Sequence, residues 1–322
     1  MNAGLKALAA LTAFAALAAR ADEVRFADLL REFSYDVSAP FDVRETEVEN
    51  RGGVVIRDMT YASPRGGRVP AYVVVPPGKG PFAAVLYGHW MMPGSPMKNR
   101  REFLDEAVAL AQSGAMALLI DAPMVRPGYT GDKDPLSSKN AYALVQQVVD
   151  FRRGIDILLS RRDVDRRRIA YVGHSFHAKV GAVLAGVDKR ISSFVLMAGS
   201  YDDKFYVFNA GTPEMLKLRK QYGDAKVREY FEKYPWDEPA RYADHATPAA
   251  VFLQFGRKDQ PISESYARHC YDLFSKPKRI EFYDAGHELN AAARRDRVEW
   301  LAGRLKLKAP PRGVLDRIPP LR

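Results

Sequence analysis

The chain alternates between short, almost fully apolar runs and longer amphipathic stretches. The apolar runs are rich in β-branched and aromatic residues and end in glycine or polar residues, which predicts buried strands. They comprise residues 82–88, 115–121, 168–173, 191–199, 249–256 and 279–285. Stretches with helical apolar spacing separate most of these strands, at 101–114, 139–161, 176–187, about 264–274 and 290–305.

A β-hairpin is predicted ahead of this alternation. Residues 54–63 and 68–76 read as strands, and "PRGG" at 64–67 separates them as a turn. Short buried strands that alternate with amphipathic helices predict a mostly parallel sheet covered on both faces. We therefore expect an α/β fold with an eight-stranded, mostly parallel sheet that begins with an antiparallel hairpin.

One long interruption, at about 201–247, falls between two predicted strands and is rich in aromatic residues. An insertion of this size over the strand ends predicts a small cap. A helical pair that merely packs on the core is the alternative.

The first residues have the layout of a secretory signal peptide. Lys6 precedes an apolar run over 7–19, and Ala19-Arg20-Ala21 forms a small-x-small cleavage site. The apolar run falls short of the roughly 20 residues that cross a bilayer, so we expect no stable membrane span. The prediction is a signal peptide over 1–21 and an exported protein, periplasmic or secreted; an uncleaved anchor is the alternative.

Composition narrows the class of protein further. With 322 residues and 47% hydrophobic residues the chain is able to bury a large core, which excludes disorder throughout. The net charge of +10 is concentrated in arginines at 152–153, 161–162 and 166–168. No nucleic-acid recognition module accompanies them, so we expect a solvated basic face and no nucleic-acid partner. The single cysteine, Cys270, has helical apolar neighbours and is expected in the core.

The stretch "YVGHSFHAKVG" places Ser175 between a predicted strand and a predicted helix. A serine on such a sharp turn projects its hydroxyl above the edge of the sheet, as a nucleophile elbow does. The N–H of Phe176 then points into the same space at the positive end of the helix. Serine also caps helices, and the pattern Gly-x-Ser-x-Gly ends here in His177, so this motif does not decide by itself.

A base and an orienting carboxylate are needed to activate a serine hydroxyl. Asp259 follows one predicted strand and His287 follows the next, so both belong to the same sheet edge as Ser175. The chain order Ser, Asp, His is that of α/β-hydrolases. Asp202 and Asp203, after the preceding strand, are the alternatives for the acid. No cluster of His, Cys and carboxylates has metal-ligand spacing, so no metal and no cofactor are expected.

With these residues the chain resembles serine α/β-hydrolases, in particular dienelactone hydrolases, acetyl xylan esterases and the catalytic domains of prolyl oligopeptidases. The resemblance rests on "RDVDRRRIAYVGHSFHA", "FGRKDQPIS" and "DAGHELN". It implies an α/β-hydrolase domain over 50–306, with an N-terminal extension at 22–49 and a proline-rich basic tail at 307–322. The extension is too short for the propeller of prolyl oligopeptidases, which makes peptidase activity the weaker alternative.

The same resemblance implies a second oxyanion donor in the loop "LYGHWMMPGS". By the family register the donor is the N–H of Trp90, with His89 in the place of the usual glycine; the N–H of His89 is the alternative. His177 is expected to pack against small neighbours behind the elbow.

Together these features predict a serine hydrolase, most simply a carboxylesterase with the triad Ser175, Asp259 and His287 and an acyl-enzyme intermediate. The expected partner is a small-molecule ester or an ester-bearing polymer. A hydrolase-like protein that binds without turnover is the alternative from another class.

Overall fold

The computed structural model describes residues 24–310 and 312–321. The predicted signal peptide lies outside the described residues. Among them, no helix is both long enough and apolar enough to cross a membrane.

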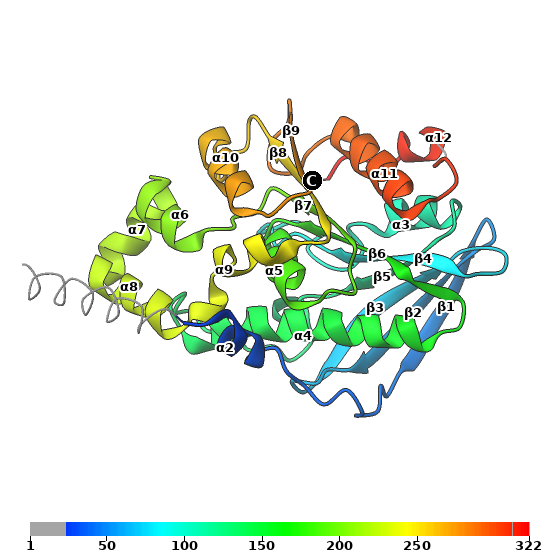
Figure 1. Ribbon diagram of the computed structural model, residues 1–322, viewed down its shortest axis with the longest axis horizontal. Coiled ribbons are helices and arrows are strands. Elements are labelled where there is room, and N and C mark those ends of the chain that lie inside the picture. Colours follow the sequence, from blue (N-terminus) through cyan, green and yellow to red (C-terminus); the bar gives the residue numbers. More distant parts are fainter. Residues whose placement is uncertain (1–23, 311, 322) are drawn as a thin grey trace, which may run out of the picture.

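A nine-stranded sheet in the order β1-β2-β3-β5-β4-β6-β7-β8-β9 forms the centre of the described chain (Figure 1). The first three strands are antiparallel, and β3 also runs antiparallel to β5. All other neighbours are parallel. The bounds are β1 (Arg44–Arg51), β2 (Val54–Ala62), β3 (Arg68–Val75), β4 (Phe82–Gly88), β5 (Ala115–Ile120), β6 (Val164–His174), β7 (Ser193–Met197), β8 (Ala250–Gly256) and β9 (Lys278–Tyr283).

The prediction of eight strands missed β1. Its sequence "RETEVENR" is exposed at all but its last position, because the strand lies at the edge of the sheet and pairs only with β2. A strand with no buried face has no apolar alternation to detect. The predicted extension at 22–49 therefore contains most of a sheet strand, preceded by the short helix α2 (Phe26–Arg31).

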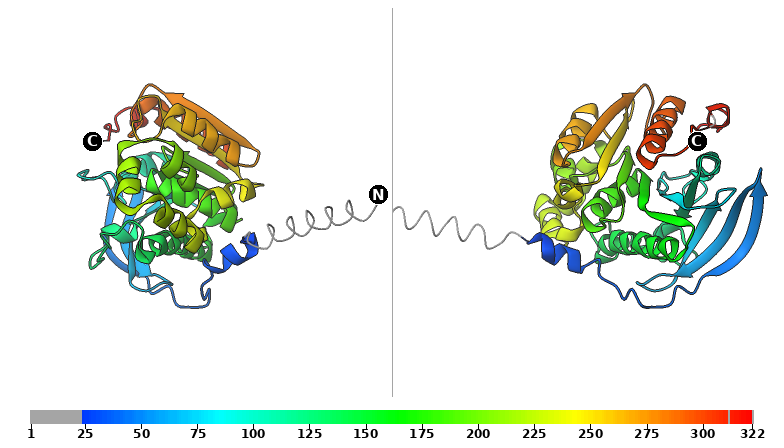
Figure 2. Two further views of the ribbon diagram at one scale, coloured as in Figure 1. Left: turned by 90° about the vertical axis from the view of Figure 1, so that its left-hand side faces the viewer. Right: turned by 45° about the vertical axis from the view of Figure 1, so that its right-hand side comes forward.

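The parallel strands bury side chains on both faces of the sheet. In β4, Ala84 and Leu86 join one core while Ala83, Val85 and Tyr87 join the other. The first core is covered by α4 (Ser138–Ser160), α5 (Phe176–Val187) and α10 (Glu264–Leu273), the second by α3 (Leu104–Ala111) and α11 (Ala291–Leu305) (Figure 2). Cys270 lies fully buried in the first core, as expected.

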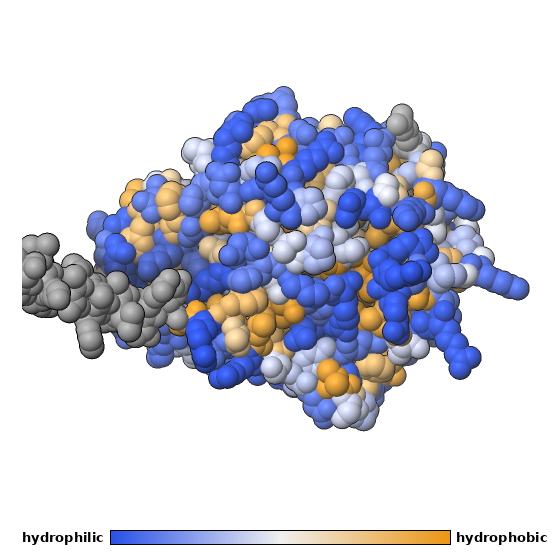
Figure 3. Space-filling view, viewed as in Figure 1, coloured by the Kyte–Doolittle hydropathy of each residue, from blue (hydrophilic) through white to orange (hydrophobic). Residues whose placement is uncertain are grey.

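The segment between β7 and β8 is helical and has a small core of its own. It contains α6 (Asp203–Asn209), α7 (Pro213–Tyr222), α8 (Asp224–Lys233), the 3-10 turns Pro235–Asp237 and Asp244–Ala246, and α9 (Ala240–Ala243). Val207, Val227, Tyr230 and Phe231 pack together with Ala141 of α4. Figure 3 shows hydrophobic residues among hydrophilic ones over α6 and α7, the helices that carry the exposed Phe205 and Leu216.

The proline-rich tail lies against the domain. Leu315, at the end of the short helix α12 (Arg312–Leu315), is buried in the second core. The Arg294 guanidinium of α11 donates to the carbonyls of Leu315, Ile318 and Pro319. These three hydrogen bonds to one buried guanidinium hold this part of the tail against α11.

Candidate active site

Ser175 lies on the predicted turn, between the end of β6 at His174 and the start of α5 at Phe176. Its backbone has φ 56° and ψ −112°, a left-handed conformation that is uncommon for a residue with a side chain. The N–H of Ser175 donates to the carbonyl of Met197 on β7 at 2.8 Å, which holds the turn in place. A Cβ at Gly173 would lie 2.2 Å from the carbonyl oxygen of His177, so this tight strand-to-helix approach requires the glycine.

The structure brings the three predicted side chains together at the carboxyl ends of the parallel strands. Nε2 of His287 lies 2.8 Å from Oγ of Ser175, and Nδ1 of His287 lies 2.9 Å from Oδ2 of Asp259. Because the carboxylate accepts from Nδ1–H, Nε2 is left with a lone pair that faces the serine hydroxyl. This arrangement is suited to removing the hydroxyl proton.

The surroundings of Asp259 hold its carboxylate in place as a hydrogen-bond acceptor. Its side chain is fully buried, and its second oxygen accepts the N–H of Ile262 at 3.0 Å. The alternative acids point elsewhere: Asp202 pairs with His269 at 2.8 Å, and Asp203 pairs with Lys179 at 2.5 Å.

The main-chain N–H of Phe176, which directly follows Ser175, has no hydrogen-bond partner among the backbone contacts of the described residues. The N–H of Trp90 has one: it donates to Oε2 of the buried Glu102 at 2.5 Å. In this geometry the N–H of Trp90, the predicted second oxyanion donor, is therefore already engaged, which favours the alternative donor, the N–H of His89. The indole of Trp90 is also buried, stacked on His174 with centroids 5.2 Å apart.

His174 and Glu102 form a buried pair that no sequence pattern predicts. Nδ1 of His174 lies 2.6 Å from Oε1 of Glu102, and Nε2 lies 2.8 Å from the carbonyl oxygen of His287. Both ring nitrogens face oxygen acceptors. No short motif signals Glu102, because the contact joins residues 72 positions apart.

His177 occupies the position of the second glycine of the motif and is completely buried. Its room comes from Gly88, where an added Cβ would lie 2.5 Å from the His177 side chain. Nδ1 of His177 faces the carbonyl oxygen of His89, and Nε2 faces the side-chain amide of Gln147 at 2.8 Å. Burial, and then the nearby ring of His89, lowers the pKa of His177 well below its usual value, so the ring is neutral.

A cleft of about 390 Å³ opens above Ser175 and His287. Its other lining residues come from the β4–α3 loop, the start of α5, the ends of β7 and β8, and the helical insertion: Met91, Met92, Pro93, Phe176, Lys179, Ala198, Ser200, Tyr206, Pro261 and Ile262. Tyr206 is the contribution of α6, which means that the insertion borders the site. Methionine, aromatic, proline and isoleucine side chains dominate the wall and favour an apolar substituent.

Lys179 connects the cleft to the insertion. It lies one turn after Ser175 on α5, and its ammonium contacts Asp203 at 2.5 Å and Asp237 at 2.9 Å. Burial alone would lower the pKa of Lys179, but the two carboxylates outweigh burial and raise it well above its usual value. The ammonium is therefore neutralised inside the protein and gives the cleft no free positive charge.

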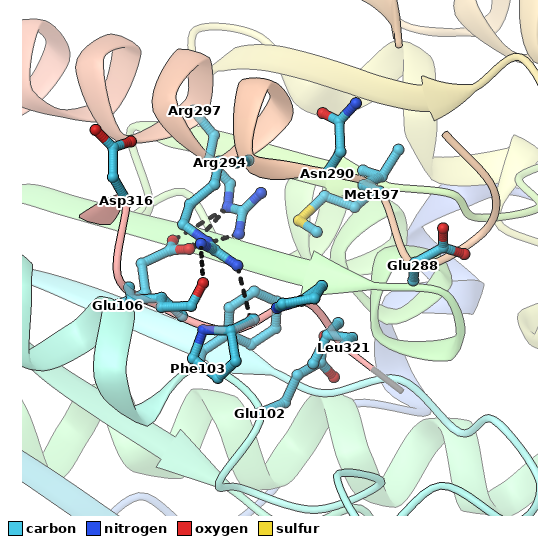
Figure 4. A pocket seen from close by; sticks show the side chains of 15 residues that line it. Glu102, Phe103, Glu106, Met197, Glu288, Asn290, Arg294, Arg297, Asp316 and Leu321 are labelled. Atoms are coloured by element: carbon cyan, nitrogen blue, oxygen red, sulfur yellow. Dashed lines mark hydrogen bonds and ion pairs between the residues drawn. The ribbon is translucent and has the colours of Figure 1, made fainter. Parts of the chain in front are cut away.

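A second cavity, of about 260 Å³, lies between α3, α11 and the tail (Figure 4). Arg297 of α11 reaches Glu106 across it at 2.5 Å, and Glu102 contributes to its wall. Neither Ser175 nor His287 lines this cavity. The loop that carries His287 contributes its next residues, Glu288 and Leu289, to the wall of this cavity.

No group of three or more His, Cys, Asp or Glu side chains is arranged to hold a metal ion in the part of the chain that the structure describes.

Comparison with known proteins shows the fold. No family model matches the chain, and no curated protein sequence matches it either. Among solved structures, an acetyl xylan esterase from Paenibacillus sp. R4 is similar with a TM-score of 0.68 and 19% identity, over 85% of this chain and 90% of that one. Acetyl xylan esterase 1 from Thermoanaerobacterium sp. JW/SL YS485 has a TM-score of 0.69 and 16% identity, over 86% and 92%.

A cold-adapted esterase from an Arctic intertidal metagenomic library is also similar, with a TM-score of 0.57 and 17% identity, over 81% of this chain and 99% of that one. These similarities confirm the predicted α/β-hydrolase fold. At such identities they show the fold alone, and function has to be argued from the site.

Proposed function

We propose that the protein is a serine hydrolase that cleaves carboxylic esters through an acyl-enzyme. The observation that carries the proposal is the hydrogen-bonded series Ser175 Oγ, His287 and Asp259, with both distances below 3.0 Å. The esterases named among the structural neighbours support an ester substrate.

The chemistry follows from the positions of the protons. His287 takes the proton of Ser175 on Nε2 while Oγ attacks the ester carbonyl, and Asp259 stabilises the imidazolium that forms. The tetrahedral intermediate collapses, His287 gives the proton to the leaving alkoxide, and an acyl-Ser175 ester remains. Water, deprotonated by His287, then attacks this ester. The second tetrahedral intermediate collapses, His287 returns the proton to Oγ of Ser175, and the acid leaves.

The oxyanion is stabilised in this proposal by the N–H groups of Phe176 and His89. Phe176 directly follows Ser175, and its N–H has no partner among the backbone contacts of the described residues. His89 is taken as the second donor because the N–H of Trp90 is engaged by Glu102. Phe176 also begins α5, so its N–H lies at the positive end of that helix. Removing one such donor costs about 10²–10³ in kcat in comparable enzymes.

Labelling with a fluorophosphonate probe tests the proposal. The wild-type protein is expected to be labelled and to hydrolyse short aryl esters, and Ser175→Ala is expected to lose both while keeping its circular dichroism spectrum. A folded wild-type protein that neither reacts with the probe nor turns over any ester would overturn the proposal and favour a binding protein.

Substrate class is tested by matched ester and amide substrates. The proposal expects higher kcat/KM for aryl esters than for aminoacyl amides with the same acyl group. Faster amide cleavage would favour the peptidase alternative.

We also propose export, on the basis of the leader-like sequence over 1–21. Mass spectrometry of the expressed protein checks this: cleavage after Ala21 and recovery outside the cytoplasm are the expected results. An intact N-terminus in the cytoplasm would contradict it.

A further inference from the structure

The peptide group that joins His89 to Trp90 is held at both of its ends. Its carbonyl oxygen faces Nδ1 of His177, and its N–H donates to Oε2 of Glu102 at 2.5 Å. A peptide group is planar, so two hydrogen bonds on opposite sides fix its rotation about the chain. Both partners are buried, which makes loss of either bond costly.

The proton positions agree with this arrangement. The ring of His177 is neutral, and Nε2 accepts from the amide of Gln147, whose oxygen accepts from Arg126 at 3.1 Å. Nδ1 of His177 therefore carries the proton and donates to the carbonyl of His89. The pairing is consistent, because each donor meets an acceptor.

The same carboxylate is connected to the catalytic histidine through His174. Oε1 of Glu102 contacts Nδ1 of His174, and Nε2–H of His174 donates to the main-chain carbonyl of His287. Glu102 thus connects the loop after β4 with the loop after β9. The ring of His174 also stacks on that of His287, with centroids 5.6 Å apart.

We infer that Glu102 and His177 are positioning residues that clamp the His89–Trp90 peptide and so fix the start of the β4–α3 loop, which carries the proposed oxyanion donor and lines the cleft through Met91 and Met92, with His174 extending the clamp to His287. The inference rests on the proposed function. It also explains two departures from the family pattern together: the imidazole at position 177 is the group that holds the loop in which His89 replaces glycine.

Matched substitutions at Glu102 and His177 separate positioning from packing. Glu102→Leu and His177→Leu remove the polar contacts at similar volume. Glu102→Gln keeps an acceptor for Trp90 N–H and offers an NH₂ group to a neutral His174; His177→Asn keeps an N–H near the position of Nδ1. We expect each leucine variant to lose about 100-fold in kcat with KM within about threefold, and each amide variant to stay within about fivefold of wild type.

The double variant Glu102→Leu/His177→Leu gives a readout that general damage would not reproduce. Both changes release the same peptide, so its loss in kcat is expected to match that of either single variant. Additive losses would overturn the clamp, as would amide variants as impaired as the leucine variants. A gain in kcat on loosening Glu102 would also overturn it, because the held peptide would then be an inhibited state.

Glu102→Asp covers the case in which a leucine variant fails to fold. It keeps the charge but withdraws the carboxylate by one methylene group, and about a tenfold lower kcat at unchanged KM is expected. Full activity in this variant would overturn the clamp. Ser175→Ala distinguishes the clamp from the proposed function. If Ser175→Ala abolishes activity while the clamp variants keep full activity, the clamp inference is overturned and the proposal of a serine hydrolase is still supported.

Discussion

Oδ2 of Asp259 lies 2.9 Å from Nδ1 of His287, and the carboxylate has no exposure to solvent. A buried carboxylate in this position holds the imidazole in one tautomer. Replacing it with an amide would present an N–H to Nδ1 and favour the opposite tautomer, in which Nε2 carries a proton and cannot accept that of Ser175.

Asp259→Asn is therefore expected to lower kcat by about 10³–10⁴-fold without unfolding the protein. Steady-state kinetics on an aryl ester, with circular dichroism to check the fold, measure this. Asp202→Asn is the matched control, since Asp202 contacts His269 and not His287. A larger loss of kcat in Asp202→Asn than in Asp259→Asn would reverse the assignment of the acid.

Gly88→Ala tests the room made for His177. The added Cβ would lie 2.5 Å from atoms of the His177 side chain, which packs against fixed neighbours. Overpacking of a dense core costs about 1–3 kcal/mol, so the free energy of unfolding in urea is expected to fall by that amount. Displacement of His177 should lower kcat as well.

Gly303→Ala is the control for this change. Gly303 lies in α11 with no other atoms within 4 Å of an added Cβ, beyond its own helix and chain neighbours. Alanine is the better helix former, so the variant is expected to be as stable as wild type or more stable by up to about 1 kcal/mol. Equal destabilisation at both positions would contradict a specific clash at Gly88.

Lys179→Met tests the ion pairs between α5 and the insertion. The change leaves the carboxylates of Asp203 and Asp237 without their cation. Because these pairs are partly exposed, the cost falls between that of a surface pair and that of a fully buried pair, about 1–3 kcal/mol. A lower thermal unfolding temperature is the expected observation. Lys258→Met, which removes a largely exposed pair with Asp284, should change stability by less than about 1 kcal/mol.

Glu238 makes stability depend on pH. Burial, and then the neighbouring charge of Asp203, raises its pKa from 4.5 to about 8 in the folded protein. The folded state therefore binds this proton more tightly than the unfolded state. Its contribution to stability is complete below pH 4.5 and is lost as the pH rises through 8.

Urea unfolding of wild type and Glu238→Gln at pH 5 and pH 9 measures this contribution. Between these values the wild type is expected to lose on the order of 4 kcal/mol more than the variant, in which the side chain no longer titrates. The same change in both proteins would show that Glu238 has no part in the pH dependence.

The parallel sheet and the positions of Ser175, Asp259 and His287 were accessible from the sequence for one physical reason. Strands buried on both faces are marked by continuous apolar runs, and each of the three residues lies within three positions of the end of such a run. The carboxyl ends of parallel strands meet at one edge of the sheet. A local pattern that marks the end of a strand therefore also predicts which residues, far apart in the chain, lie close together.

What the sequence did not show depends on contacts between distant residues. β1 is an edge strand with almost no buried side chain, so burial left no pattern in it. The engagement of Trp90 N–H depends on where the Glu102 carboxylate lies, and no motif encodes that position. The room for His177 depends on Gly88, a residue of another strand.

The ion pairs of Lys179 have a consequence for how substrates enter. The ammonium of Lys179 lies on the helix that begins after Ser175, and it pairs with Asp203 and Asp237 of the insertion. Moving the insertion away from the cleft would therefore leave charged groups unpaired on both sides. The ion pairs therefore hold the insertion against α5, so the cleft lined by Tyr206, Met91 and Met92 is expected to keep its shape when a substrate enters.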